Sequence, residues 1–473
     1  MLFNSFAFAV FLPIVFCLYW LIPLKKKRRE YRNILILTSS YIFYGWWDWR
    51  FLILILFTSL TSYASGLLIE RNRHPKAVLA ANLVINLGLL AYFKYANFFI
   101  GSLDAALQAA GIRAGMETLK IILPVGISFY TFQSLSYSID VYRGKLPASH
   151  EVIDFLAFVS FFPQLVAGPI ERAGNLLPQF EKDRQFDYRN AVHGLFLIIY
   201  GLLLKIVIAD RIAIFIDKVY ASPQTAHGAP VLLAVIFFAF QLYLDFYAYS
   251  EIARGTAKLF GIEIMVNFRR PYLASSFKEF WKRWHISLSS WFMDYVYIPL
   301  GGNRKGPARK ALNLMTVFLL SGLWHGASWT FVVWGALNGL FLILLDKPLS
   351  YTSKIPGLNQ VIIFCLWALS LVFFRAENFA DAVSIFGNLG FTGWEGVFGA
   401  GLNKAMLFFS IAMIVMLMIW ENIMEKKSGP GLCMLLDSRP YVRWAIAVTL
   451  ILFIVLTGSY GIDNDSTFIY FQF

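Results

Sequence analysis

Apolar runs long enough to cross a membrane recur along the whole chain, and this feature most restricts how the chain can fold. A helix needs about 20 consecutive apolar residues to cross about 30 Å of hydrocarbon. Such runs include Phe3–Ile22, Ala77–Ile100, Ile121–Ile139 and Ile153–Val166. Because some runs are short and fit re-entrant helices, we expect roughly 11 crossings in total. The pattern predicts an all-α, multi-pass membrane protein with a single domain over residues 1–473.

Charge content excludes an ordinary soluble protein. Charged residues make up 15% of the chain, whereas soluble domains carry about 25%. The net charge of +13 is expected in cytoplasmic loops, where membrane proteins concentrate Lys and Arg, so nucleic acid is not expected as a partner. The cluster Lys25–Arg29 follows the first apolar run and places the N-terminus outside. Cys17, Cys365 and Cys433 are scattered, which predicts neither a disulfide framework nor a metal site.

One segment, 267–310, is too polar to span a membrane and too aromatic for a solvated loop. It holds nine Lys and Arg against two acids, Glu279 and Asp294. Its large apolar residues recur at helical spacing: Phe277, Trp281, Trp284, Leu288 and Trp291. A basic helix with such a face is typical of the membrane interface. We therefore predict one interfacial or re-entrant helix here, on the cytoplasmic side.

One carboxylate lies in apolar surroundings. Asp245 falls in the run QLYLDFYAYS beside Tyr243, and a carboxylate at membrane depth usually faces a protein interior or a cavity. A structural hydrogen-bond network and a direct functional role remain equally open for it. His150 matches an HxxxD pattern, but Glu151 and the residues after it fit an ordinary helix start.

His285 and His325 are the candidate catalytic histidines. His325 lies between Gly322 and Gly326, and small residues allow a substrate or a neighbouring helix to come close. A neutral imidazole, with a pKa of about 6.5, can remove a hydroxyl proton at neutral pH. A buried histidine with a purely structural role is the alternative that spacing alone leaves open.

Three long strings carry a family resemblance: FFPQLVAGPIER, FKEFWKRWHISLSSWFMDYVYIPLGGNR and SGLWHGASWTFVVWG. They resemble the signature segments of the membrane-bound O-acyltransferase family, most closely its bacterial alginate O-acetylase-like branch. The resemblance covers essentially the whole chain. It implies a helical bundle with a central funnel, in which His325 is catalytic and His285 is a second active-site residue. The residues expected to line the funnel are Trp324, Asp245, Tyr243, Trp284 and Asn303.

The C-terminal tail, 458–473, ends in FIYFQF. This ending resembles the C-terminal peptide that accompanies the acyltransferases of teichoic-acid D-alanylation. The resemblance implies that Tyr470 accepts an acyl group. Aromatic residues that only anchor the tail at the membrane interface are the alternative.

The resemblance implies an O-acetyltransferase of the bacterial inner membrane that modifies an exported or cell-wall polysaccharide, alginate-like in kind. The expected donor is a cytoplasmic thioester, acetyl-CoA or an acyl carrier protein, with no bound cofactor or metal. The expected partners are the polysaccharide, a secreted or membrane-anchored SGNH-type acetyltransferase, a possible carrier protein and membrane lipid. Two alternatives remain open, namely a transporter or flippase, and an acyltransferase whose cargo is D-alanyl or a longer acyl chain.

Overall fold

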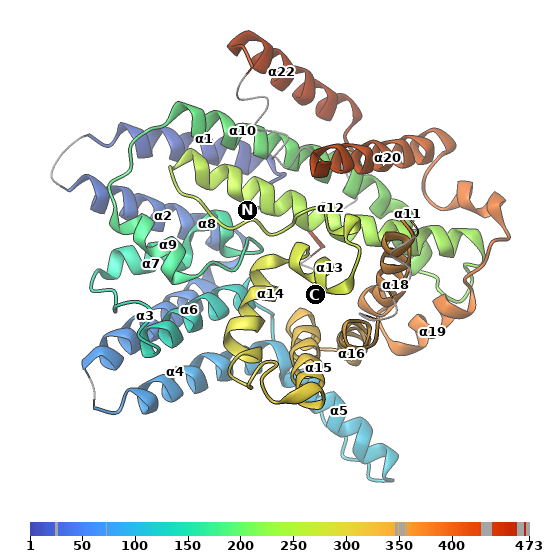
Figure 1. Cartoon of the computed structure of the whole chain (residues 1–473), viewed down its shortest axis with the longest axis horizontal. Helices are drawn as coiled ribbons and strands as arrows, with labels where there is room; N and C mark the ends of the chain where they lie inside the picture. The colour runs from blue at the N-terminus through green and yellow to red at the C-terminus, as the bar shows by residue number, and fades with distance from the viewer. Residues whose placement is uncertain are drawn as a thin grey trace. The chain divides into compact units, whose positions relative to one another are not determined.

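The computed structural model describes residues 1–23, 27–71, 73–345, 349, 355, 357–426, 438–460, 468 and 469. Over these residues the regular structure is helical (Figure 1), with one isolated bridge between Gly228 and Leu389. Two compact units can be distinguished. The first comprises Met1–Ala191 and Thr256–Met265, and the second Val192–Gly255 and Val266–Phe473.

Seven helical segments of the described chain are long and apolar enough to cross a membrane: Arg28–Arg71, Pro75–Ala109, Tyr188–Tyr220, Ala229–Leu259, Leu358–Arg375, Lys404–Lys426 and Pro440–Thr457. Two shorter apolar helices are Phe6–Leu21 and Trp329–Leu344. The predicted all-helical, multi-pass class is therefore confirmed. The expected total of roughly 11 crossings is not confirmed.

The helices of the first unit are α1 (Phe6–Leu21), α2 (Arg28–Asp48), α3 (Leu52–Arg71), α4 (Pro75–Leu90), α5 (Ala96–Ala109), α6 (Ile127–Tyr142), α7 (Val152–Ser160), α8 (Phe162–Leu165) and α9 (Ala173–Glu181). Helix α1 begins where the Ser5 hydroxyl accepts the Phe8 amide, and α4 begins with Pro75, which needs no amide partner at that position.

Two predicted spans of this unit are wrong. The run Ile121–Ile139 does not form one helix, because α6 starts at Ile127, after Pro124 and a left-handed Gly126 with φ 77°. The run Ile153–Val166 is divided at Phe161 into α7, with 9 residues, and α8, with 4. Neither piece reaches the length of a membrane crossing.

A polar seam joins α3, α4 and α6, which lie side by side in Figure 1. Asn82 of α4 donates to the Ser138 hydroxyl of α6 at 2.9 Å. On α3, Gly66 lies so close to Tyr137 that an added Cβ would be 2.2 Å from the phenol oxygen. Small and hydrogen-bonding residues replace apolar contacts at such helix interfaces in membranes.

The second unit holds most of α10 (Tyr188–Leu202), the π-helical turn η3 (Leu203–Ala209), α11 (Asp210–Tyr220) and most of α12 (Ala229–Leu259). It continues with α13 (Phe277–Arg283), α14 (Ile286–Phe292), α15 (Gly306–His325), α16 (Trp329–Leu344), α18 (Leu358–Arg375), α19 (Phe379–Gly387), α20 (Lys404–Lys426) and α22 (Pro440–Thr457).

The prediction of one continuous helix in segment 267–310 is also wrong. Residues 277–292 form two short helices, α13 and α14, because the backbone breaks at Trp284 and His285. The Ser276 hydroxyl accepts the Glu279 amide at the start of α13. Trp284, Leu288 and Trp291 are buried inside the second unit rather than displayed as a surface stripe. The break turns a continuous apolar face into a corner that projects His285 inward.

Helices α15 and α16 cross at glycines. The small residues beside His325 left open whether a substrate or a neighbouring helix comes close, and the structure shows the helix. A Cβ on Gly322 would lie 2.3 Å from the Phe331 carbonyl oxygen, and one on Gly335 would lie 2.3 Å from that of Phe318. Gly326 is equally crowded, because its added Cβ would lie 2.0 Å from the Phe331 ring. The glycines around His325 therefore admit a neighbouring helix, and this contact fixes the end of α15.

Candidate active site

The two candidate histidines, distant in sequence, come together in the second unit. His325 is the last residue of α15, and His285 lies at the corner between α13 and α14. Their ring centroids are 6.2 Å apart, and both side chains are buried. Trp324 contacts both rings, at 5.8 Å from His285 and 5.0 Å from His325. The structure therefore brings together three of the residues predicted from the sequence.

His285 is held in a left-handed conformation, with φ 42° and ψ 55°. This region is uncommon for residues other than glycine. It costs free energy, so it persists only where surrounding contacts fix it. Those contacts come from the irregular segment that follows α12. The Ile286 amide donates to the Asn267 carbonyl at 2.9 Å, and the Arg269 amide donates to the Arg283 carbonyl at 2.9 Å.

The Asn267 side chain also decides which His285 nitrogen carries the proton. Asn267 Oδ1 lies 3.1 Å from His285 Nδ1 and accepts from the Ser287 amide at 3.2 Å. The Ser287 backbone N–H can only donate, so the Asn267 atom that it shares with His285 is an oxygen. His285 Nδ1 must therefore donate its hydrogen to that oxygen. Nε2 then carries the lone pair, which is the form that can accept a proton from a substrate hydroxyl.

Burial keeps this imidazole neutral. It lowers the pKa of His285 to about 3, because the charged form loses its hydration inside the unit. At pH 7 the ring is therefore an uncharged base rather than a cation. A neutral ring is the state that general-base chemistry requires.

Aromatic side chains surround both imidazoles. Phe246 of α12 packs edge-on to His285 at 4.6 Å. His325 lies 5.1 Å from the Trp334 ring and 5.3 Å from the Phe374 ring. Such walls keep bulk water away from both imidazoles.

Two further predicted residues lie beside this cluster in the same unit. Trp284 packs against Trp367 at 4.7 Å and Tyr243 at 6.0 Å. Tyr243 donates its hydroxyl to Glu421 of α20 at 2.5 Å and stacks on Tyr247 at 5.4 Å. The Tyr243 hydroxyl thus bonds to a buried carboxylate rather than to an imidazole.

Asp245 forms a separate buried cluster. It pairs with Lys205 of η3 at 2.6 Å, and Lys205 also pairs with Asp210 at 2.8 Å. The other oxygen of Asp245 accepts the backbone amide of Ile469 at 2.5 Å. The structural network that the sequence left open is therefore present, and it includes the C-terminal tail.

Of the remaining predicted site residues, one is described and lies away from the histidines. Asn303 is exposed in the turn before α15. Tyr470 lies outside the described residues, although Phe468 and Ile469 directly before it are described and buried. The other described candidates, His285, His325, Trp284, Trp324, Tyr243 and Asp245, all lie in the second unit.

Sequence reasoning missed Asn267, which precedes His285 by 18 residues. Because the family resemblance places His285 in the active site of an O-acyltransferase, we predict that Asn267→Ala lowers acyl transfer by about 10- to 100-fold through loss of the His285 alignment. Ser287→Ala is the matched control, since it removes a 2.9 Å bond to the same oxygen but leaves the imidazole bond. Rates are compared at equal amounts of membrane-inserted protein. Equal losses in both variants would contradict an orienting role for the Asn267–His285 bond.

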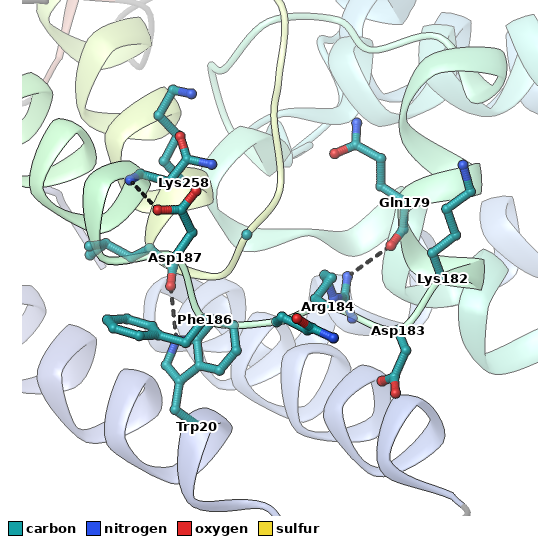
Figure 2. Close-up of a pocket in the computed structure, with 12 residues that line it drawn as sticks. Trp20, Gln179, Lys182, Asp183, Arg184, Phe186, Asp187 and Lys258 are labelled. Carbon is teal, nitrogen blue, oxygen red and sulfur yellow. Dashed lines mark hydrogen bonds between the residues drawn. The ribbon is translucent and has the colours of Figure 1, made fainter. Parts of the chain in front are cut away.

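The first unit contains a separate cavity of about 500 Å³. Figure 2 shows its walls, where the Trp20 indole donates to the Leu259 carbonyl at 3.0 Å and the Arg184 guanidinium donates to the Gln179 carbonyl at 3.3 Å. Lys258 pairs with Glu263 at 2.6 Å nearby. The cavity is lined by charged and amide side chains, and its lining includes no histidine.

Comparison with known proteins gives a consistent result. Residues 144–380 match the sequence profile of the membrane-bound O-acyltransferase family. The chain is 37% identical over 493 residues to "Probable alginate O-acetylase AlgI" of Pseudomonas putida, covering 99% of each chain. It is 35% identical over 441 residues to "Peptidoglycan O-acetyltransferase" of Helicobacter pylori, covering 85% of this chain and 82% of the relative. Identity to "Teichoic acid D-alanyltransferase" of Streptococcus thermophilus is 29% over 271 residues, covering 52% of this chain and 63% of the relative.

Proposed function

We propose that this chain, which belongs to the membrane-bound O-acyltransferase family and is a membrane O-acetyltransferase, moves acetyl groups from a cytoplasmic thioester to an exported polysaccharide. The relatives named for O-acetylation of alginate and of peptidoglycan support a cell-surface glycan as the final acceptor. An alginate-like polysaccharide is the acceptor we favour, because the relative named for alginate covers more of this chain. The proposed location is the bacterial inner membrane.

The observation that carries this proposal is the buried pair of imidazoles, with ring centroids 6.2 Å apart. Transfer of an acetyl group to a hydroxyl requires removal of the hydroxyl proton as the oxygen attacks. The neutral His285, with its lone pair on Nε2, meets the electronic requirement for a base. His325, at the tightly packed end of α15, is the residue to which the family resemblance assigns catalysis.

The proposed first step uses Tyr470 as acceptor. The Tyr470 oxygen attacks the thioester carbonyl, a C–O bond forms, and the C–S bond breaks. A histidine, which we propose is His325, takes the phenol proton and returns it to the departing thiolate, so that a free thiol leaves. In the second step a hydroxyl oxygen attacks the aryl ester carbonyl and forms a new C–O bond. The C–O bond to Tyr470 breaks, and the proton of the attacking hydroxyl passes to the departing phenolate.

The chemistry of the phenol supports this relay. With a pKa of about 10, a phenol leaves more readily than a sugar alkoxide, so an aryl ester keeps the acetyl group activated. The donor we propose is acetyl-CoA or an acyl carrier protein, which binds transiently as a substrate. A secreted or membrane-anchored SGNH-type acetyltransferase is the proposed partner that carries the acetyl group from Tyr470 to the glycan.

The alternatives are less well supported. A transporter or flippase does not require acyl transfer, whereas the family and the named relatives are acyltransferases. D-alanyl cargo is disfavoured because the D-alanyltransferase relative covers about half of this chain, and the relatives named for O-acetylation cover most of it.

Sealed, inside-out membrane vesicles test the proposed donor side. We expect radiolabelled acetyl-CoA added to the exposed cytoplasmic face to label the C-terminal peptide of the protein. The reason is that acetyl-CoA does not cross the bilayer, so only a donor site on that face can use it. Right-side-out vesicles are the control and should remain unlabelled. Labelling of right-side-out vesicles alone would contradict a cytoplasmic donor.

A further inference from the structure

The buried cluster of Lys205, Asp210 and Asp245 holds two carboxylates and one lysine. Lys205 Nζ lies 2.8 Å from Asp210 and 2.6 Å from Asp245. All three residues belong to apolar helical segments, where a surplus charge is costly. The second carboxylate, beside a lysine that is already paired, therefore requires a further hydrogen-bond donor.

The C-terminal tail provides that partner through its backbone. The Ile469 amide donates to the second Asp245 oxygen at 2.5 Å. Hydrogen bonds to an ionised acceptor are shorter and stronger than neutral ones. Because a backbone amide is the donor, the bond fixes the position of the tail along its own sequence.

Phe468 adds side-chain contacts at the same place. Its ring lies 4.4 Å below the Lys205 ammonium and 4.7 Å from the Tyr249 ring. Asp245 and Tyr249 are four residues apart on α12, so they share one face of that helix. Phe468 and Ile469 are 1% and 3% exposed, which shows that they are inserted into the second unit.

The start of the tail is attached to the same π-helical turn. The Ser459 amide donates to the Ile206 carbonyl at 3.0 Å, next in sequence to Lys205. The Arg211 guanidinium donates to the Thr457 carbonyl at the end of α22. Insertions of π-helix into α-helices frequently mark functional sites.

We propose that Asp245, oriented by Lys205 of η3, is the receptor site for the chain's own C-terminal peptide. The docking stands on the contacts above. A second step rests on the proposed function: Asp245 is then a positioning residue that holds the tail so that Tyr470, the next residue after Ile469, can be acetylated.

Photo-crosslinking in the full chain tests the docking directly. With Phe468 replaced by p-benzoylphenylalanine, illumination is expected to join the tail to peptides that contain Lys205 or Tyr249, identified by mass spectrometry. This measurement leaves the receptor residues intact, so it does not depend on a perturbed fold. Crosslinks that map to other segments, or an absence of intramolecular crosslinks, would overturn the proposal.

Two matched variants separate the tail contact from charge balance. Asp245→Leu removes the acceptor while Lys205 keeps Asp210, and we expect the crosslink yield and Tyr470 acetylation to fall by about 10-fold or more. Asp210→Asn removes the other carboxylate and should retain both. Equal loss in the two variants would contradict a specific tail receptor.

The crosslink positions, taken together with the activity of Tyr470→Phe, separate the tail-docking proposal from the acyl relay. Crosslinks at the predicted peptides together with a fully active Tyr470→Phe variant would retain the docking and reject the relay. Crosslinks elsewhere together with an inactive Tyr470→Phe variant would reject the docking and retain the relay.

Discussion

His325→Ala is expected to reduce polysaccharide acetylation by about 10²- to 10⁴-fold, because it removes general-base assistance to the attacking hydroxyl. The imidazole is packed among Trp324, Trp334 and Phe374, so its removal also leaves a cavity. His325→Gln is therefore tested beside it, since glutamine fills much of the space and cannot act as a base at neutral pH. Acetyl content of the polysaccharide, at equal amounts of protein in the membrane, is the measurement.

A control histidine distinguishes catalysis from general damage. His227 lies on the exposed turn before α12 and bonds to Asn388 at 2.8 Å. We expect His227→Ala to retain acetylation. Near-normal acetylation by both His325 variants would exclude His325 as the catalytic residue.

Tyr470→Phe is expected to reduce acetylation to background, because it removes the hydroxyl that accepts the acetyl group while keeping the aromatic ring. The preceding residues Phe468 and Ile469 remain available to hold the tail in place. The variant thus separates an acyl acceptor from a tail that only anchors in the membrane.

Tyr460→Phe is the matched control for this change. Tyr460 belongs to the same tail, is 60% exposed and donates its hydroxyl to the Ile454 carbonyl at 2.9 Å. The same loss of a single hydroxyl there should not affect acetylation. If Tyr470→Phe and Tyr460→Phe both acetylate at the wild-type level, the tail is an anchor and the relay is wrong.

The sequence predicted the membrane class, and it singled out the two candidate histidines, because both inferences depend on local features. Apolar runs and the WHIS and WHG strings can be read without knowing which segments meet. The two glycines that flank His325 predicted a close neighbour, either a substrate or a helix, and the structure shows that α16 is a close neighbour. The resemblance then supplied the expectation that His285 and His325 share a site, and the structure brings them together.

The misjudged elements depend on tertiary packing. Helical spacing from Phe277 to Trp291 predicted one helix, but the Asn267 backbone accepts the Ile286 amide and stabilises a break at His285. A lone asparagine 18 residues earlier in the chain gives no periodic signal. Likewise, no pattern within QLYLDFYAYS indicates that Asp245 binds Lys205 and a tail amide more than 220 residues away, at Ile469.

The expected number of crossings was not confirmed for a related reason. Hydropathy measures apolar length, and it does not distinguish a span from a run divided by a turn. Phe161 separates α7 from α8 inside one apolar run, and Gly126 delays the start of α6 in another. In both places the conformation of one residue overrides the hydrophobic pattern.

Mass spectrometry of the C-terminal peptide tests histidine-dependent transfer to the tail most directly. The peptide is isolated from cells that produce the wild type, His325→Gln or Tyr470→Phe. We predict that a fraction of the wild-type peptide is heavier by about 42 Da, with the acetyl group on the Tyr470 oxygen, and that both variants lack this mass. An unmodified wild-type peptide in cells that acetylate their polysaccharide, or the same modification in His325→Gln, would contradict histidine-dependent transfer to the tail.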